Sequence, residues 1–179
     1  MNTMEKLLLM VLFTVGIVSC GSDSDSPLEE RWDVSFQNPR VSECWGFNAP
    51  SDTTSRMALN GNEQLLWSYD ENESLLTIVH TGVVLNCCGD RSIEAFMDDD
   101  VLVIAENDQP GEEGRCWCIC PFDFAVEITG VPQKTVRLRL ERTVDAVKTW
   151  TWSGSIALKD SAGEITFENP AYPATSFTQ

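Results

Sequence analysis

Six cysteines outside the first twenty residues limit the folds open to this chain more than any other feature. They form an isolated residue, an adjacent pair and an alternating set: Cys44, Cys87 and Cys88, and Cys116, Cys118 and Cys120. Alternate residues of a strand point to one face at a spacing of about 6 to 7 Å, whereas the Cβ atoms of a disulfide lie about 3.8 Å apart. The alternating set must therefore find its partners elsewhere in the chain.

Three disulfides are the expected state, and fifteen pairings are possible in principle. An adjacent pair could bond to itself only through a strained eight-membered ring. We therefore predict that Cys87 and Cys88 each bridge to the alternating set and that the third member of the set joins Cys44. Each bridge would stabilise the fold by about 2 to 4 kcal/mol.

The start of the chain has the layout of a secretion signal. An apolar run from Leu7 to Val18 follows a short head whose only positive side chain is Lys6. Such a run reaches about 18 Å as a helix, which is short for a bilayer span. The four residues ending in Cys20 resemble the lipobox of bacterial lipoproteins, in which cleavage leaves the cysteine as the acylated first residue. Residues 1–19 are therefore expected to be a lipoprotein signal peptide, and an ordinary secreted protein is the alternative.

Residues 20–27 are small and polar, as expected of a flexible tether from a lipidated Cys20. Acyl chains on Cys20 would hold the protein on the membrane without any further membrane-binding surface. Gly21 follows the cysteine in place of the Asp that retains some lipoproteins at the inner membrane. We therefore expect an outer membrane lipoprotein of the cell envelope, on its periplasmic or its surface face, where cysteines are oxidised.

Removal of the 19 residues before Cys20 from the 179-residue chain leaves 160, enough for one domain, which we place at residues 28–179. The leader contains one acid and one base, so the mature chain keeps the net charge of −16. A surface of this charge repels nucleic acid, and no nucleic-acid partner is expected. Solubility explains the charge most simply.

Apolar residues recur in short alternating runs that have the length of strands. The expected strands are 32–36, 64–69, 75–85, 92–97, 101–106, 116–129, 135–143, 148–158 and 164–168, with polar or glycine-containing turns between them. Trp150 and Trp152 alternate with polar residues and are expected to pack in the core. One short helix is possible near 51–59. The pattern predicts an all-β, disulfide-stabilised antiparallel β-sandwich of the immunoglobulin-like kind with little helix, and a closed barrel is the alternative.

The cysteines belong to an ordered series of motifs. Asn86-Cys87-Cys88 is followed by Cys116-Trp117-Cys118-Ile119-Cys120-Pro121-Phe122-Asp123. This series resembles that of a group of uncharacterised bacterial lipoproteins, common in Bacteroidota, that carry Asn-Cys-Cys before a Cys-x-Cys-x-Cys-x-Phe/Tyr-Asp strand. The resemblance covers roughly residues 74 to 140. It implies an all-β lipoprotein and no particular activity, cofactor or partner.

Clustered cysteines also allow a metal site. Its ligands would be thiolates and the one histidine of the chain: His80, Cys87, Cys88, Cys116, Cys118 and Cys120. Such ligands suit Zn²⁺ or Cu(I), but the spacing differs from the Cys-x₂-Cys of structural zinc sites. For His80 alone, a hydrogen-bonded place in a strand is an equally good interpretation. Acidic turns at Asp98-Asp99-Asp100 and at 70–73 could bind Ca²⁺, although solvated turns are the simpler expectation.

No catalytic motif is present in the sequence, and we expect no enzyme, although a carboxylate-pair hydrolase is an alternative. A rigid domain on a lipid tether suits recognition through its loops. The expected function is a cell-envelope binding or interaction module, with a protein or a glycan as partner and no cofactor. The alternative is a thiol-based metal-binding or redox protein.

Overall fold

The computed structural model describes residues 32–48 and 62–168, and the expected leader, tether and 51–59 helix lie outside these residues. Nine strands account for most of the described chain: β1 (Ser35–Val41), β2 (Glu63–Asp70), β3 (Leu75–Asn86), β4 (Gly89–Asp98), β5 (Val101–Pro110), β6 (Ile119–Thr129), β7 (Thr135–Val144), β8 (Val147–Ala157) and β9 (Ala162–Phe167). A short 3₁₀ helix, η2 (Leu158–Asp160), links β8 to β9. Within the described ranges, no helix has the length and apolar character needed to cross a bilayer.

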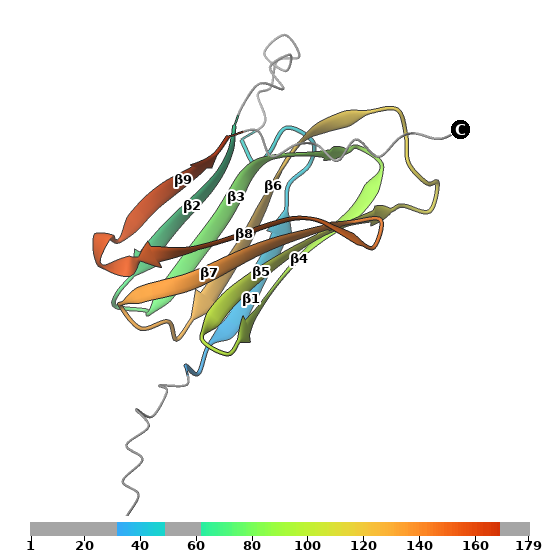
Figure 1. The fold of residues 1–179 in the computed structure, drawn as a ribbon. Helices are drawn as coiled ribbons and strands as arrows, with labels where there is room; N and C mark the ends of the chain where they lie inside the picture. The colour runs from blue at the N-terminus through green and yellow to red at the C-terminus, as the bar shows by residue number, and fades with distance from the viewer. Residues whose placement is uncertain (1–31, 49–61, 169–179) are drawn as a thin grey trace, which may run out of the picture. The chain divides into compact units, whose positions relative to one another are not determined.

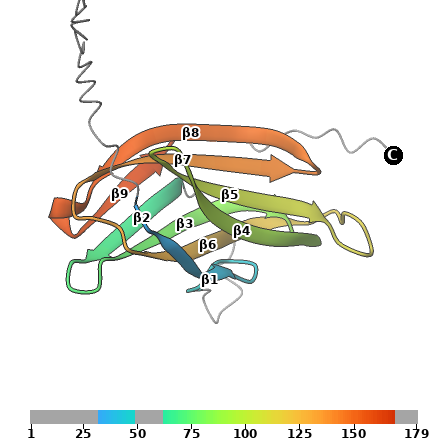
Figure 2. The same cartoon turned by 90° about the horizontal axis from the view of Figure 1, so that it is seen from below.

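Two sheets lie face to face, as Figures 1 and 2 show from perpendicular directions. One has five strands in the order β1-β6-β3-β2-β9, and the other has four in the order β4-β5-β7-β8. Buried residues from both sheets form one hydrophobic cluster between them. The all-β, disulfide-stabilised sandwich expected from the alternating pattern is thus confirmed, while its immunoglobulin-like subtype stays a prediction.

One strand pair departs from the expected antiparallel arrangement. β5 and β7 run parallel, with Ile104 opposite Leu140, while all other neighbouring strands are antiparallel. Between β5 and β7 the chain crosses to the other sheet to form β6, and this crossover returns β7 in the same direction as β5. A period-two pattern describes the faces of a strand and not its direction, so it could not have predicted this pairing.

Strand boundaries also differ from the sequence prediction at two places that matter for the cysteines. β1 was expected at 32–36 and runs from Ser35 to Val41, so it ends close to Cys44. The strand expected from Cys116 begins only at Ile119. Cys116 and Cys118 therefore lie in the connection before β6, and their alternation does not place all three cysteines on one strand face.

The core follows from alternation along the central strands. In β6, Phe122, Phe124 and Val126 point inward and are almost fully buried. In β7, Val136, Leu138 and Leu140 do the same against the arginines that alternate with them. Trp150 and Trp152 are partly buried and pack against this core from the edge strand β8, as expected.

Replacing a core side chain of β6 tests this arrangement. Phe124 is fully buried, so Phe124→Ala should lower the free energy of unfolding by about 3 to 5 kcal/mol. Phe96 on β4 is 42% exposed, and Phe96→Ala should cost less than about 1 kcal/mol. Urea unfolding followed by tryptophan fluorescence measures both values, and equal losses would contradict the assignment of the core.

Candidate functional site

Three disulfides converge on the start of β6. Cys44 bonds to Cys120, Cys87 to Cys118 and Cys88 to Cys116. This matches the predicted division, in which the adjacent pair bridges to two members of the alternating set and Cys44 takes the third. The bridges join the segment after β1 and the turn between β3 and β4 to residues 116–120.

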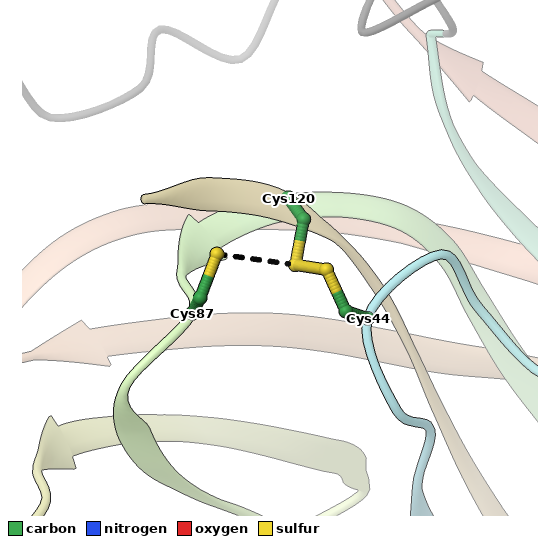
Figure 3. Close-up of side chains that lie close together, drawn as sticks. All are labelled: Cys44, Cys87 and Cys120. Carbon is green, nitrogen blue, oxygen red and sulfur yellow. Dashed lines mark hydrogen bonds between the residues drawn. A yellow bond between two sulfur atoms is a disulfide. The ribbon is translucent and has the colours of Figure 1, made fainter. Parts of the chain in front are cut away.

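Two of these disulfides touch each other. The Sγ atom of Cys87 lies 3.6 Å from that of Cys120, and the sulfur atoms of Cys44, Cys87 and Cys120 all lie within 4.8 Å of one another (Figure 3). Three thiolates at this spacing could hold a metal ion. The disulfides occupy the sulfurs, so this requires reduction of both bonds.

The metal set expected from the sequence is not brought together. The three sulfur atoms that lie close together include that of Cys44, which was not among the predicted ligands. This group lacks four of the predicted ligands: Cys88, Cys116, Cys118 and His80. His80 contacts carboxylates instead of sulfur atoms.

The connection between β5 and β6, residues 111–118, is held by more than its disulfides. Asn86 donates from Nδ2 to the Cys116 carbonyl oxygen at 2.6 Å and accepts from the Cys116 amide at 3.3 Å. The Cys87 amide donates to the Cys118 carbonyl oxygen at 3.0 Å. Together with the disulfides at Cys116 and Cys118, these bonds fix the backbone on both sides of Trp117.

Arg115 attaches the same connection to the four-stranded sheet. Its guanidinium donates to Asp108 Oδ2 at 2.8 Å and to Asp145 Oδ1 at 2.6 Å. Asp108 is buried in β5, and Asp145 lies in the turn between β7 and β8. The connection is therefore braced against both sheets, by disulfides on one side and by ion pairs on the other.

Trp117 lies at the centre of this braced connection with 81% of its surface exposed. It is flanked by Cys116 and Cys118, and Ile119 beyond them is 38% exposed. An indole is usually buried because of its large apolar area. An exposed indole on backbone fixed from both sides is therefore the clearest candidate for a contact surface in the described part of the chain.

A second unusual feature is a charged network inside the sandwich. His80 on β3 and Glu63 on β2 face Glu106 on β5 and Arg142 on β7 across the two sheets, and all four side chains are at most 5% exposed. His80 Nδ1 lies 2.5 Å from Glu106 Oε1, and its Nε2 lies 3.4 Å from Glu63 Oε2. Arg142 donates to both oxygens of Glu63, at 3.0 and 2.8 Å, and to Glu106 Oε2 at 3.0 Å.

Burial alone would lower the pKa of His80, but the carboxylates of Glu106 and Glu63 outweigh it and raise this pKa from 6.5 to about 9. Burial likewise acts to raise the pKa of Glu106, and His80 and Arg142 together shift it below its usual value. At neutral pH the network therefore holds two positive and two negative charges, which balance one another.

Aromatic rings pack against the two positively charged side chains of this network. His80 stacks on Trp150, with ring centroids 5.8 Å apart, and Phe167 meets both rings edge-on. The Arg142 guanidinium lies 5.1 Å from the centre of the Trp150 ring. Because all four charged side chains are buried and pair across the two sheets, the arrangement is suited to joining the sheets.

The acidic turns are engaged by the protein itself. Asp98 pairs with Arg139 at 2.6 Å, and Asp100 pairs with Arg137. Asp70 Oδ1 accepts hydrogen bonds from the backbone amides of residues 72 and 73, as an Asx turn does. These contacts place arginines or backbone amides against carboxylates in both turns.

A polar pocket of about 480 Å³ lies beside the β2–β3 turn. Its lining includes Ser68, Asp70, Asn72, Thr77, Gln133 and Ser161. Tyr69 forms part of the wall, and its hydroxyl donates to the Val131 carbonyl oxygen at 2.7 Å. The pocket therefore has hydrogen-bonding groups but no exposed aromatic face like that of Trp117.

Sequence reasoning did not identify Glu63, Glu106 or Arg142, although a signal was present. Each continues an inward-pointing alternation, as Glu106 does after Leu102 and Ile104 in β5. Trp117 lies within the cysteine motif, but the motif by itself assigns no role to it. No family model, curated protein or solved structure matches the chain.

Stability should depend on pH through His80. Its pKa in the fold exceeds the unfolded value, so the proton on His80 stabilises the protein fully below about pH 6.5, and this stabilisation is lost as the pH rises through about 9. The free energy of unfolding should fall by about 3 kcal/mol between pH 6 and pH 10. Urea titrations at several pH values measure it. The His80→Gln variant should be less stable at pH 6 and nearly flat across this range, and parallel pH curves for the two proteins would contradict the argument.

Removal of Arg142 should be costly because it leaves two carboxylates buried together. Arg142→Met is expected to lower the free energy of unfolding by about 3 to 5 kcal/mol. Lys148 on β8 forms an exposed pair with Glu141 at 2.6 Å and provides the control. Lys148→Met should change stability by less than about 1 kcal/mol. Comparable losses in thermal unfolding would show that the buried network has no special role.

Proposed function

We propose that this chain is a lipid-anchored binding module of the bacterial cell envelope, held at the outer membrane through acyl chains on Cys20. The recognition surface in this proposal is the braced connection 111–118 with Trp117 at its centre. The exposure of Trp117 on a backbone fixed by two disulfides is the observation that carries the proposal.

A fixed loop favours binding because the loop is already ordered in the folded protein, before any ligand binds. Association normally costs free energy for immobilising loops and side chains, and preorganisation reduces that cost. The Trp117 backbone is held by bonds on both sides, and an indole has few rotatable bonds. Its large, exposed indole surface can contact a ligand without a further change of the loop.

The charge around Trp117 favours a neutral glycan as the partner. Glu112 and Glu113 are exposed in the same connection, and the guanidinium of Arg115 is paired with Asp108 and Asp145. A sugar ring presents an apolar face to an indole and hydroxyl groups to nearby polar atoms, whereas phosphates and nucleic acids would be repelled. Few large apolar side chains are exposed in the described part of the chain, and this gives less support to a large protein interface.

Anchoring is supported by the sequence: the apolar leader, the lipobox-like residues ending in Cys20 and the polar tether that follows. When cells that express the full chain are grown with labelled palmitate, the label should be attached to the protein. The labelled protein should be found in the membrane fraction of these cells. Cys20→Ser should abolish both without changing the fold of the described residues. Label that persists in Cys20→Ser would contradict this part of the proposal independently of any binding result.

Binding is tested with neutral polysaccharides immobilised on an array and with the Cys20→Ser chain as a secreted probe. Trp117→Ala should weaken binding at least about tenfold, equivalent to about 1.4 kcal/mol, because it removes the main contact surface. Phe96→Ala, which removes an exposed aromatic side chain from β4, should leave binding unchanged. Equal binding by all three proteins, or binding to none of the polysaccharides, would contradict the glycan proposal.

The second candidate is a thiol-based metal or redox protein, favoured by the close sulfur atoms of Cys44, Cys87 and Cys120. Its metal-binding form requires reduced thiols, and soft ions such as Cu(I) suit three thiolate ligands. The oxidising compartment expected from the leader disfavours that form. The binding module therefore ranks first.

A further inference from the structure

Two disulfides of this protein are in contact, and they differ in how far solvent reaches them. Cys118 is exposed, and its partner Cys87 is half-buried. Cys120 is 1% exposed, and its partner Cys44 is half-buried. The 3.6 Å contact between the sulfur atoms of Cys87 and Cys120 thus connects an accessible disulfide to a protected one.

An external thiolate can reach the first bond at Cys118. Attack on the sulfur of this exposed residue makes Cys87 the leaving group. The Cys87 thiolate formed in this way lies beside Cys120, whose sulfur is bonded to Cys44. The buried sulfur of Cys120 is therefore within reach of a thiolate of the chain, although a reagent in solution cannot easily reach it.

We propose that these two disulfides form an internal thiol–disulfide relay that carries exchange from Cys118 to Cys44. In the first step, an external thiolate bonds to the sulfur of Cys118, and the Cys87–Cys118 bond breaks. In the second step, the Cys87 thiolate bonds to the sulfur of Cys120, and the Cys44–Cys120 bond breaks. Cys44 leaves as a thiolate and takes a proton from water. The number of disulfides is unchanged, and no oxidant is needed.

The second step needs a small rotation of Cys87. Exchange proceeds when the attacking sulfur approaches along the axis of the S–S bond. Cys87 Sγ lies within 4.8 Å of the sulfurs of both Cys44 and Cys120, so in the oxidised protein it flanks their bond. Cleavage from Cys118 releases the Cys87 side chain and allows it to turn about χ1 into line.

The relay changes which parts of the chain are tied together. The Cys44–Cys120 bond spans 76 residues, and a Cys87–Cys120 bond would span 33. The segment after β1 would lose its covalent attachment to β6, while hydrogen bonds from the amides of Ser42 and Trp45 to β6 would remain. Thiol exchange at Cys118 in the exposed connection would therefore release the segment after β1 from β6 without disrupting the sandwich. The proposed relay does not depend on what Trp117 binds.

Mapping of disulfides in the full chain tests the relay. The oxidised protein is treated with reduced glutathione at pH 8, blocked with N-ethylmaleimide, digested without reduction and analysed by mass spectrometry. Among molecules with glutathione on Cys118, the expected products are a Cys87–Cys120 linkage and a blocked Cys44. Blocked Cys44 should exceed blocked Cys87 by at least about threefold. Blocked Cys87 with an intact Cys44–Cys120 bond overturns the proposal, as does glutathione on Cys87 in place of Cys118.

Two single variants give a matched comparison without added glutathione. Cys118→Ser leaves Cys87 without its disulfide partner when the protein folds. The relay predicts that Cys87 then bonds to Cys120 and that the free thiol is found on Cys44. Cys116→Ser leaves a thiol on Cys88, whose sulfur is not in the described three-sulfur group, so it should stay on Cys88. Blocking of Cys87 in the first variant overturns the relay. Migration of the thiol in the second shows unspecific exchange and also overturns it.

Discussion

Covalent bonding at residues 116–120 is the constraint on which the organisation of this end of the sandwich depends. Three disulfides draw the segment after β1 and the turn between β3 and β4 onto a stretch of five residues. A stretch with so many attachments has little freedom left, so Trp117 within it can be exposed without being loosely held. The same crowding brings the sulfur atoms of Cys87 and Cys120 into contact. Rigid display of the indole and proximity of the two disulfides are thus two consequences of one arrangement.

The interior of the sandwich is joined in a different way. His80 and Glu63 extend from one sheet and Glu106 and Arg142 from the other, and their charges balance when His80 is protonated. Such a network is costly to desolvate and is tolerated because each charge has an opposite neighbour. It also fixes the register of the strands, since shifting a strand by one residue would turn its charged side chain to the outer face and leave the partner charges buried without it. The disulfides act on the unfolded chain as well, whereas this network acts only in the folded state.

Much of the fold could be predicted from alternation, because inward and outward side chains are a local property of a strand. The strand β7 could be predicted in this way from Val136, Leu138 and Leu140. The geometry of disulfides predicted that the adjacent cysteines and Cys44 each bridge to the alternating set. The parallel pairing of β5 with β7 could not be predicted, since it depends on a crossover between sheets. The buried network was missed for another reason. Glu106 and Arg142 continue apolar alternations, and their countercharges come from each other on neighbouring strands and from His80 and Glu63 on the opposite sheet, which the pattern of a single strand does not reveal.

Position along the chain links the two features of the braced connection. Trp117 and Cys118 are adjacent exposed residues, and the Cys87–Cys118 disulfide is one of the two that fix the backbone at Trp117. The proposed function requires this backbone to stay fixed, because Trp117 is displayed on it. Exchange at Cys118, in turn, breaks one of the two disulfides that hold Trp117 and so removes part of its preorganisation. The proposed recognition at Trp117 and the proposed exchange at Cys118 are therefore coupled, because the exchange would weaken the preorganisation of the surface that a ligand would occupy.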